Sequence, residues 1–258
     1  MSRLTQKGQS APLDIFKTST DTSLATMVGS KFDSVDGREF VLVQNGGVAL
    51  VAGNLIQGPV SIGANHTGLA VVSNVVIGAK AITVTLGGTL ATANQYQGGF
   101  AVVSAGTGLG QTFRIASHPA GTLNGNVVLT LEDAVLVALA SADSKISLTL
   151  NPYGSMYGTD VTTSGVVISP TTATGPSIGV TISPIPASTA TVPSYGLIQT
   201  KGPVACLNIG NTAIGLDVMA GSGTAGSVIT YIAATRNRVG TATVAGENAK
   251  AQIINLQL

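Results

Sequence analysis

Apolar and polar residues alternate along many short segments of this chain. In TFRIAS, Phe113 and Ile115 fall on one side of an extended strand, and Thr112 and Arg114 fall on the other. This period of two is typical of β-strands with one buried face. Six strand-like segments precede residue 151, namely FVLVQ, AITVTL, GFAVVS, TFRIAS, NVVLTL and KISLTL. Turn sequences such as NGG, LGG and NGN separate most of them, so the pattern predicts an all-β protein.

Two stretches depart from this alternation. LEDAVLVALAS, residues 131–141, begins with acidic residues and continues as an apolar run, which allows either a short helix or a buried connection. Residues 169–196 contain five prolines, which exclude a central strand through most of the stretch. We therefore expect at most one short helix, and linker or sheet-edge structure around the prolines.

The charged residues are concentrated near the N terminus. Of the 12 basic and 11 acidic residues, ten lie within the first 40 positions, in a segment without a sustained hydrophobic period. We predict two β-sandwich or barrel-like blocks preceded by an extended N-terminal arm. A disordered tail is the alternative for that arm. The expected division is an arm at residues 1–37, a β domain at 38–152, a proline-rich linker or edge segment at 153–194 and a second β block at 195–258.

The composition argues against several classes of protein. Charged residues make up only 9% of the chain, against about 25% in a typical soluble domain. No stretch approaches the roughly 18 consecutive apolar residues of a spanning helix, so we expect no membrane partner. The formal net charge is +1 without a dense cluster of Lys and Arg, which gives no indication of nucleic-acid binding. The first ten residues lack the apolar core of a secretory signal.

The glycines at Gly106, Gly108 and Gly110 suggest a phosphate-binding loop at first sight. The dinucleotide fingerprint requires a third glycine at the sixth position and a helix after it. Gln111 occupies that position, and the strand-like TFRIAS follows. We interpret Gly106, Gly108, Gly110 and Gln111 as a structural β-turn, with no cofactor bound there.

Few residues offer catalytic or metal-binding chemistry. His66 and His118 are the only histidines, neither has a ligand at metal-binding spacing, and we expect both to be loop residues with local hydrogen bonds. The adjacent acids Glu132 and Asp133 are explained by a helix N terminus. Cys206 lies in the apolar run PVACLNI, which favours a buried side chain over a nucleophile. The sequence therefore predicts no catalytic residues, no metal and no cofactor.

The order of several segments resembles a family of tailed-bacteriophage virion proteins, the head structural or decoration proteins. The segments are DGREFVLVQNGGVALVAGNLIQGP, ANHTGLAV, TVTLGGTLATANQYQGGFAVVSAGTGLGQTFRIASHPAG and LEDAVLVALASADSKISLTLNPYG, followed by YGLIQTKGPVACLNIGN. The resemblance covers roughly residues 36–235. It implies that the glycine turn is a hairpin corner braced by Gln111 and Arg114.

The resemblance also implies a function. It indicates a decoration or cement protein that is made in the host cytoplasm and binds the outer face of an icosahedral head, where it bridges subunits of the major capsid protein. The expected self-association is a homotrimer, with a dimer or a monomer as alternatives. The other hypothesis is a binding module of a tail fibre or surface adhesin.

Overall fold

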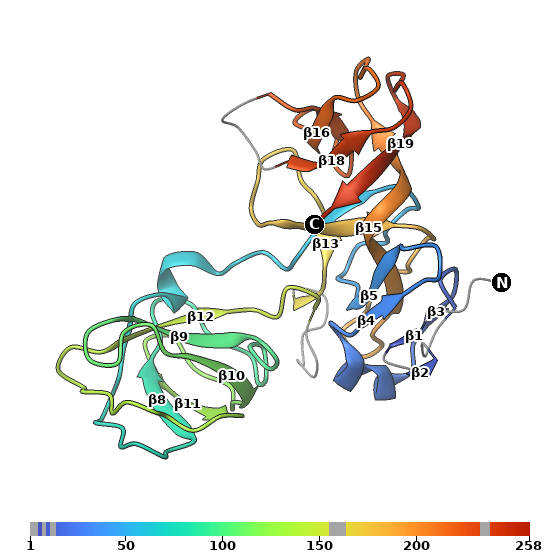
Figure 1. The fold of residues 1–258 in the computed structure, drawn as a ribbon. Helices are drawn as coiled ribbons and strands as arrows, with labels where there is room; N and C mark the ends of the chain where they lie inside the picture. Colours follow the sequence, from blue (N-terminus) through green and yellow to red (C-terminus); the bar gives the residue numbers. More distant parts are fainter. Residues whose placement is uncertain (1–4, 7–8, 11–13, 155–163, 233–237) are drawn as a thin grey trace. The chain divides into compact units, whose positions relative to one another are not determined.

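The structure is a computed structural model of the chain, and it describes residues 5–6, 9–10, 14–154, 164–232 and 238–258 (Figure 1). Strands dominate it, which confirms the predicted all-β class with two barrel-like blocks. The chain forms two compact units. The large-sheet unit comprises Met1–Val60, Pro152–Gly154 and Val161–Leu258, and the described part of the barrel unit is Ser61–Asn151.

The barrel unit is a closed six-stranded antiparallel barrel. Its sheet has the order β7-β12-β9-β10-β11-β8. Val71, directly after β7, bridges Val84 of β8, so the two outer strands of this order also meet. Closure leaves no free strand edge. The elements are η2 (Gly63–His66), β7 (Leu69–Ala70), β8 (Ala81–Thr85), β9 (Phe100–Ala105), β10 (Thr112–Ser117), β11 (Asn126–Leu131) and β12 (Lys145–Thr149).

The predicted alternation accounts for the core of this barrel. Ile82 and Val84 of β8 point inward, as do Phe113 and Ile115 of β10, while the residues between them are at least partly exposed. Each strand therefore supplies one apolar face to a single interior.

The large-sheet unit is organised around one long strand, β15 (Tyr195–Asn208). The first half of β15 pairs with β5 and β14, and the second half pairs with β19. Figure 1 shows β15 and β19 running side by side. The other elements are β1 (Thr5–Gln6), β2 (Gln9–Ser10), β3 (Thr18–Ser19), η1 (Thr22–Met27), β4 (Lys31–Asp33), β5 (Glu39–Gln44), β6 (Leu55–Gln57), β13 (Val167–Ile168), β14 (Ser177–Thr181), β16 (Asp217–Ala220), β17 (Val228–Thr230), β18 (Arg238–Ala242) and β19 (Lys250–Gln257).

The two halves of β15 contribute to separate cores. Ile198, in the first half, packs with Val41, Val43 and Ile56. Val204 and Cys206, in the second half, pack in a cluster that includes Leu256. One strand thus contributes to both of these cores.

The N-terminal boundary differs from the sequence expectation of an arm at 1–37. From Asp14 onward the segment belongs to the large-sheet unit: β3 pairs with β15, β4 pairs with β5, and Leu24 and Phe32 are buried. The elements of this segment are too short to produce a long periodic pattern of apolar residues, so the sequence does not indicate that these residues are buried. Parts of the expected arm, residues 1–4, 7–8 and 11–13, lie outside the described residues.

The expected domain at 38–152 also differs from the structure. β5 and β6 belong to the large-sheet unit, and the barrel unit begins at Ser61. The last five residues of β5 are all buried, so this strand has no solvent face. Its continuous FVLV run is typical of a strand covered on both faces, unlike the alternating barrel strands.

The expected linker at 153–194 contains an internal strand. β14 pairs with β6 on one side and with β15 on the other. Its five residues lie between Pro176 and Pro184, so no proline interrupts its hydrogen bonds. Residues 155–163 of this segment lie outside the described residues.

The expected short helix is absent at residues 131–141. After β11 the chain follows bends, and Leu139 forms an isolated antiparallel bridge with Val75. The stretch is an irregular connection that is only partly buried: Val135 and Leu139 are buried, whereas Leu136 and Val137 are exposed. Two short 3-10 helices, η1 and η2, occur elsewhere, where at most one helix was expected.

Candidate functional site

The glycine turn forms the hairpin between β9 and β10. Gly106, Gly108 and Gly110 all have positive φ values, between 75° and 91°, which is the region that glycine adopts without steric cost. Gly106 also lies against the backbone of Asp143, where an added Cβ would come within 2.3 Å of the carbonyl oxygen. A strand follows the turn, so the amides of a helix N terminus, which a dinucleotide-binding loop requires, are missing here.

Gln111 ties this hairpin to the connection after β11. Its Oε1 accepts hydrogen bonds from the backbone N–H groups of Leu136 (3.0 Å) and Val137 (2.9 Å). Its Nε2 donates to the carbonyl oxygens of Val137 (2.9 Å) and Gly108 (3.3 Å). One side chain therefore satisfies backbone groups of two loops that lack a sheet partner.

Arg114, unlike Gln111, forms an ion pair, and its partner is Glu132. Its Nε lies 3.5 Å from Oε1 of Glu132, and both side chains are well exposed. The ion pair joins β10 to the residue that follows β11, and an exposed pair of this kind adds little stability.

The two histidines are buried on either side of Tyr96. His66 accepts a hydrogen bond at Nδ1 from the Tyr96 hydroxyl and donates from Nε2 to the carbonyl oxygen of Thr89, at 2.9 Å. The Nε2 atom of His118 accepts from the Tyr96 backbone N–H at 3.0 Å, so Nδ1 carries the proton and donates to the Pro119 carbonyl at 2.8 Å. His66 is 1% exposed and His118 is 3% exposed.

Burial favours the neutral forms of two members of this cluster, His118 and Tyr96. Burial lowers the pKa of His118 and raises the pKa of Tyr96. The expected loop position and local hydrogen bond are found for His118, which bonds to the Pro119 carbonyl, whereas His66 lies in η2 and bonds to Tyr96 and Thr89. Both side chains are buried, which the sequence does not indicate. No sequence spacing shows this, since His66 and His118 are brought together only by the barrel.

Cys206 is fully buried on β15, as the sequence indicates. Burial raises the pKa of its thiol to about 12. A thiol in this environment carries almost no thiolate at neutral pH, so it is a packing residue rather than a nucleophile.

A pocket with polar groups lies beside the middle of β15. Its volume is about 400 Å³, and its lining includes Phe16, Arg38, Gly53, Gln199 and Ala205. All of these residues belong to the large-sheet unit.

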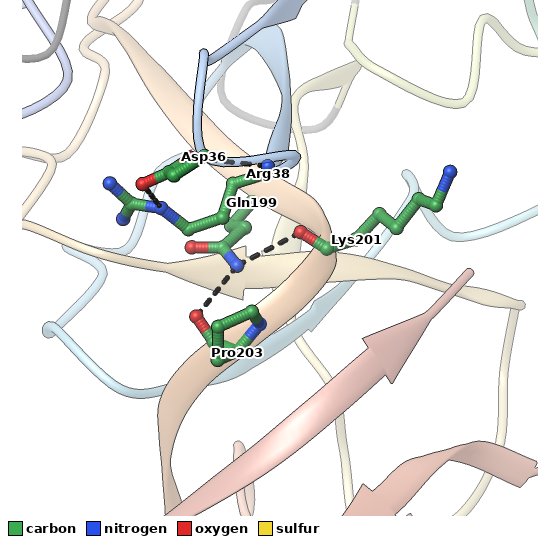
Figure 2. Close-up of polar contacts among 5 residues, drawn as sticks. All are labelled: Asp36, Arg38, Gln199, Lys201 and Pro203. Carbon is green, nitrogen blue, oxygen red and sulfur yellow. Dashed lines mark hydrogen bonds and ion pairs between the residues drawn. The ribbon is translucent and has the colours of Figure 1, made fainter.

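Gln199 forms one wall of this pocket. Its Nε2 donates to the carbonyl oxygens of Lys201 and Pro203, both at 2.9 Å (Figure 2). These two bonds fix the orientation of the carboxamide. Its Oε1 is buried and has no hydrogen-bond partner within the described part of the chain. Figure 2 shows this oxygen on the side of the Arg38 guanidinium.

Asp36 and Phe40 position the Arg38 side chain beside the same pocket. Its Nε donates to Oδ2 of Asp36 at 2.8 Å, and its guanidinium carbon lies 5.3 Å from the centre of the Phe40 ring. Its two Nη groups are not used by these contacts. No sequence pattern links Arg38 to Gln199, because they are 161 positions apart and only the pairing of β5 with β15 brings them together.

Two further findings concern metals and membranes. The part of the chain that the structure describes contains no group of three or more His, Cys, Asp and Glu residues that could hold a metal ion. Among those same residues, no helix is long and apolar enough to cross a membrane.

Comparison with known proteins returned no match to a family model, to a curated protein or to a solved structure.

Proposed function

We propose that this protein is a virion structural protein of a tailed bacteriophage, which binds the outer face of the icosahedral head and stabilises it by bridging capsid subunits. The observation that carries the proposal is the ordered set of segments between residues 36 and 235 that resembles head decoration proteins. A protein that binds only the assembled shell shifts the equilibrium toward that shell.

An exposed apolar surface on the barrel unit supports this role. Five large apolar side chains, each 50–75% exposed, occupy three loops at one end of the barrel. These loops are joined by the Gln111 hydrogen bonds and by the bonds between Val75 and Leu139. We call this surface the apolar loop patch; it consists of Val76, Ile77, Leu109, Leu136 and Val137.

The apolar loop patch is suited to binding because hydrogen bonds connect its loops and hold the apolar side chains together. Gathered apolar side chains on a soluble surface mark interaction sites more often than isolated ones. We propose that the apolar loop patch contacts the major capsid protein.

A pair of matched double variants tests this contact. We expect Ile77→Ser with Leu136→Ser to bind undecorated heads at least about tenfold more weakly, a loss above ~1.4 kcal/mol. The control, Leu90→Ser with Leu123→Ser, changes two exposed apolar residues at the opposite end of the barrel and should bind normally. Equal binding by both variants, measured by sedimentation with heads, would remove the patch from the proposal.

The location and copy number of the protein test the function itself. Electron cryomicroscopy of purified particles should show it on the head exterior in hundreds of copies. A handful of copies on the tail would instead support a tail-fibre or adhesin module.

We further propose that the protein acts as a homotrimer, since closed symmetry is the usual way to bury neutral apolar surfaces. Light scattering should then give three times the 25.6 kDa chain mass. A doubled mass would indicate a dimer, and the single chain mass would refute self-association.

A further inference from the structure

The second half of β15 has one edge that is only partly covered. In the antiparallel pair with β19, peptide groups of alternate residues point toward the partner. Leu207 donates its N–H to the Gly53 carbonyl at 2.9 Å, which places the peptide groups of Pro203, Ala205 and Leu207 on the side away from β19. β5 covers this side only as far as Lys201.

Neighbouring groups satisfy most of this edge. The Lys201 and Pro203 carbonyls accept from Gln199, and the Leu207 N–H reaches Gly53. Pro203 has no N–H to satisfy, which explains how a proline fits within a 14-residue strand.

Ala205 is the exception on this edge. Neither its N–H nor its carbonyl has a hydrogen-bond partner among the described residues, and the residue is exposed in the pocket beside Arg38. A residue whose N–H and carbonyl lack partners among the described residues therefore lines a pocket of about 400 Å³, with its carbonyl oxygen close to Gly53.

We propose that this pocket binds an extended peptide segment, which forms a one-residue β-bridge with Ala205. The peptide carbonyl accepts from the Ala205 N–H, and the peptide N–H donates to the Ala205 carbonyl. The small residues Ala52, Gly53 and Ala251 line the pocket, so a backbone can approach closely. This inference does not depend on the proposed head-binding function.

Arg38 and Gln199 supply a second set of contacts to the same peptide. The Nη groups of Arg38, which have no hydrogen-bond partner among the described residues, donate to a carbonyl or carboxylate oxygen of the ligand. The Gln199 carboxamide oxygen accepts from an amide N–H once the partly exposed Arg38 side chain moves aside. A buried acceptor without a hydrogen bond is destabilising, and binding of a donor removes that penalty.

The geometry favours a peptide over other small ligands. An extended backbone presents N–H and C=O groups at the spacing that one strand residue offers. A sugar also carries donors and acceptors, so a monosaccharide is the competing ligand in the test.

The first measurement tests whether the edge is open in the free protein. Amide hydrogen exchange by NMR on the full chain should be faster at Ala205 than at Val204 and Cys206, whose amides face β19. Ala205→Pro should melt close to the wild type, because the fold does not use this N–H. Leu207→Pro should melt lower, because it loses the bond to Gly53. Slow exchange at Ala205, or strong destabilisation by Ala205→Pro, would overturn the open edge.

The second measurement tests the ligand. Acetyl-tetraalanine amide, titrated to about 20 mM because a short bridge is expected to bind near 1 mM, should shift the Ala205 amide and the Gln199 side-chain amide resonances. Ala205→Ser keeps the N–H and should retain these shifts, whereas Ala205→Pro should lose them. Unchanged spectra, equal binding by Ala205→Pro, or shifts with glucose alone would each refute peptide binding.

Discussion

At the scale of single residues, side chains with several hydrogen bonds hold this fold together. Gln111 bonds to four backbone groups, and Gln199 bonds two carbonyls of its own strand. His66 and His118 bond to Tyr96 and to nearby carbonyls. These amide and imidazole groups bond to backbone groups that the sheet hydrogen bonds leave without a partner.

The buried state of His118 predicts a pH dependence of stability. Burial lowers its pKa in the folded protein, so the unfolded chain, with a pKa of about 6.5, binds the proton more readily. Stability should be constant above about pH 7 and should fall as the pH drops below about 6.5 toward the lowered folded value. Thermal unfolding of the barrel unit between about pH 5 and 8 measures this slope.

A substitution at His118 separates this effect from the other titrating groups. Glutamine keeps an acceptor for the Tyr96 N–H but does not titrate, so His118→Gln should show a flatter profile over the same pH range. The comparison uses slopes, because the variant is also expected to be less stable at every pH. Parallel profiles would mean that His118 is not the responsible group.

At the scale of elements, the β9–β10 hairpin depends on a contact with a loop outside it. The turn glycines set the backbone path, while Gln111 attaches the turn to residues 136 and 137. Removing that side chain should loosen both segments at once.

We expect Gln111→Ala to lower the free energy of unfolding of the barrel unit by about 2–4 kcal/mol, because four hydrogen bonds are lost and each contributes about 0.5–1 kcal/mol. Thr130 is an exposed residue of β11, so Thr130→Ala is a suitable control and should change stability by less than about 0.5 kcal/mol. Urea unfolding measures both variants. Equal stabilities would show that solvent replaces the Gln111 bonds without cost.

At the scale of the whole molecule, the two units differ in the number of chain segments that form them. The described barrel unit is one continuous segment, whereas the large-sheet unit combines segments from both sides of it. The barrel therefore behaves as an insertion between β6 and the later strands of the large sheet.

This organisation predicts how fragments behave. Residues 61–151 expressed alone should fold and unfold cooperatively, because the barrel is closed and has its own core. Residues 38–152 should be less soluble, since β5 would lose β15 and expose Val41 and Val43. Circular dichroism and sedimentation distinguish the fragments. A folded, soluble 38–152 together with an unfolded 61–151 would contradict this division.

The sequence by itself determined the local features of this protein. Alternation in segments such as TFRIAS specified strands with one buried face, because side chains on a strand point to opposite sides in turn. The glycines likewise indicated the turn at residues 106–111, and the apolar neighbours of Cys206 indicated its burial, because both features depend on a few adjacent residues.

Only the tertiary structure decided which segments meet. β5 pairs with β15, although the barrel segment separates them in the sequence. β14 pairs within the sheet although a proline flanks it on each side. Tyr96 forms hydrogen bonds with two histidines that are far apart in the chain. The residues of the pocket beside β15 are also far apart in the chain. The physical reason is that any strand edge offers the same backbone donors and acceptors, so the choice of partner depends on how the complete set of apolar faces is buried.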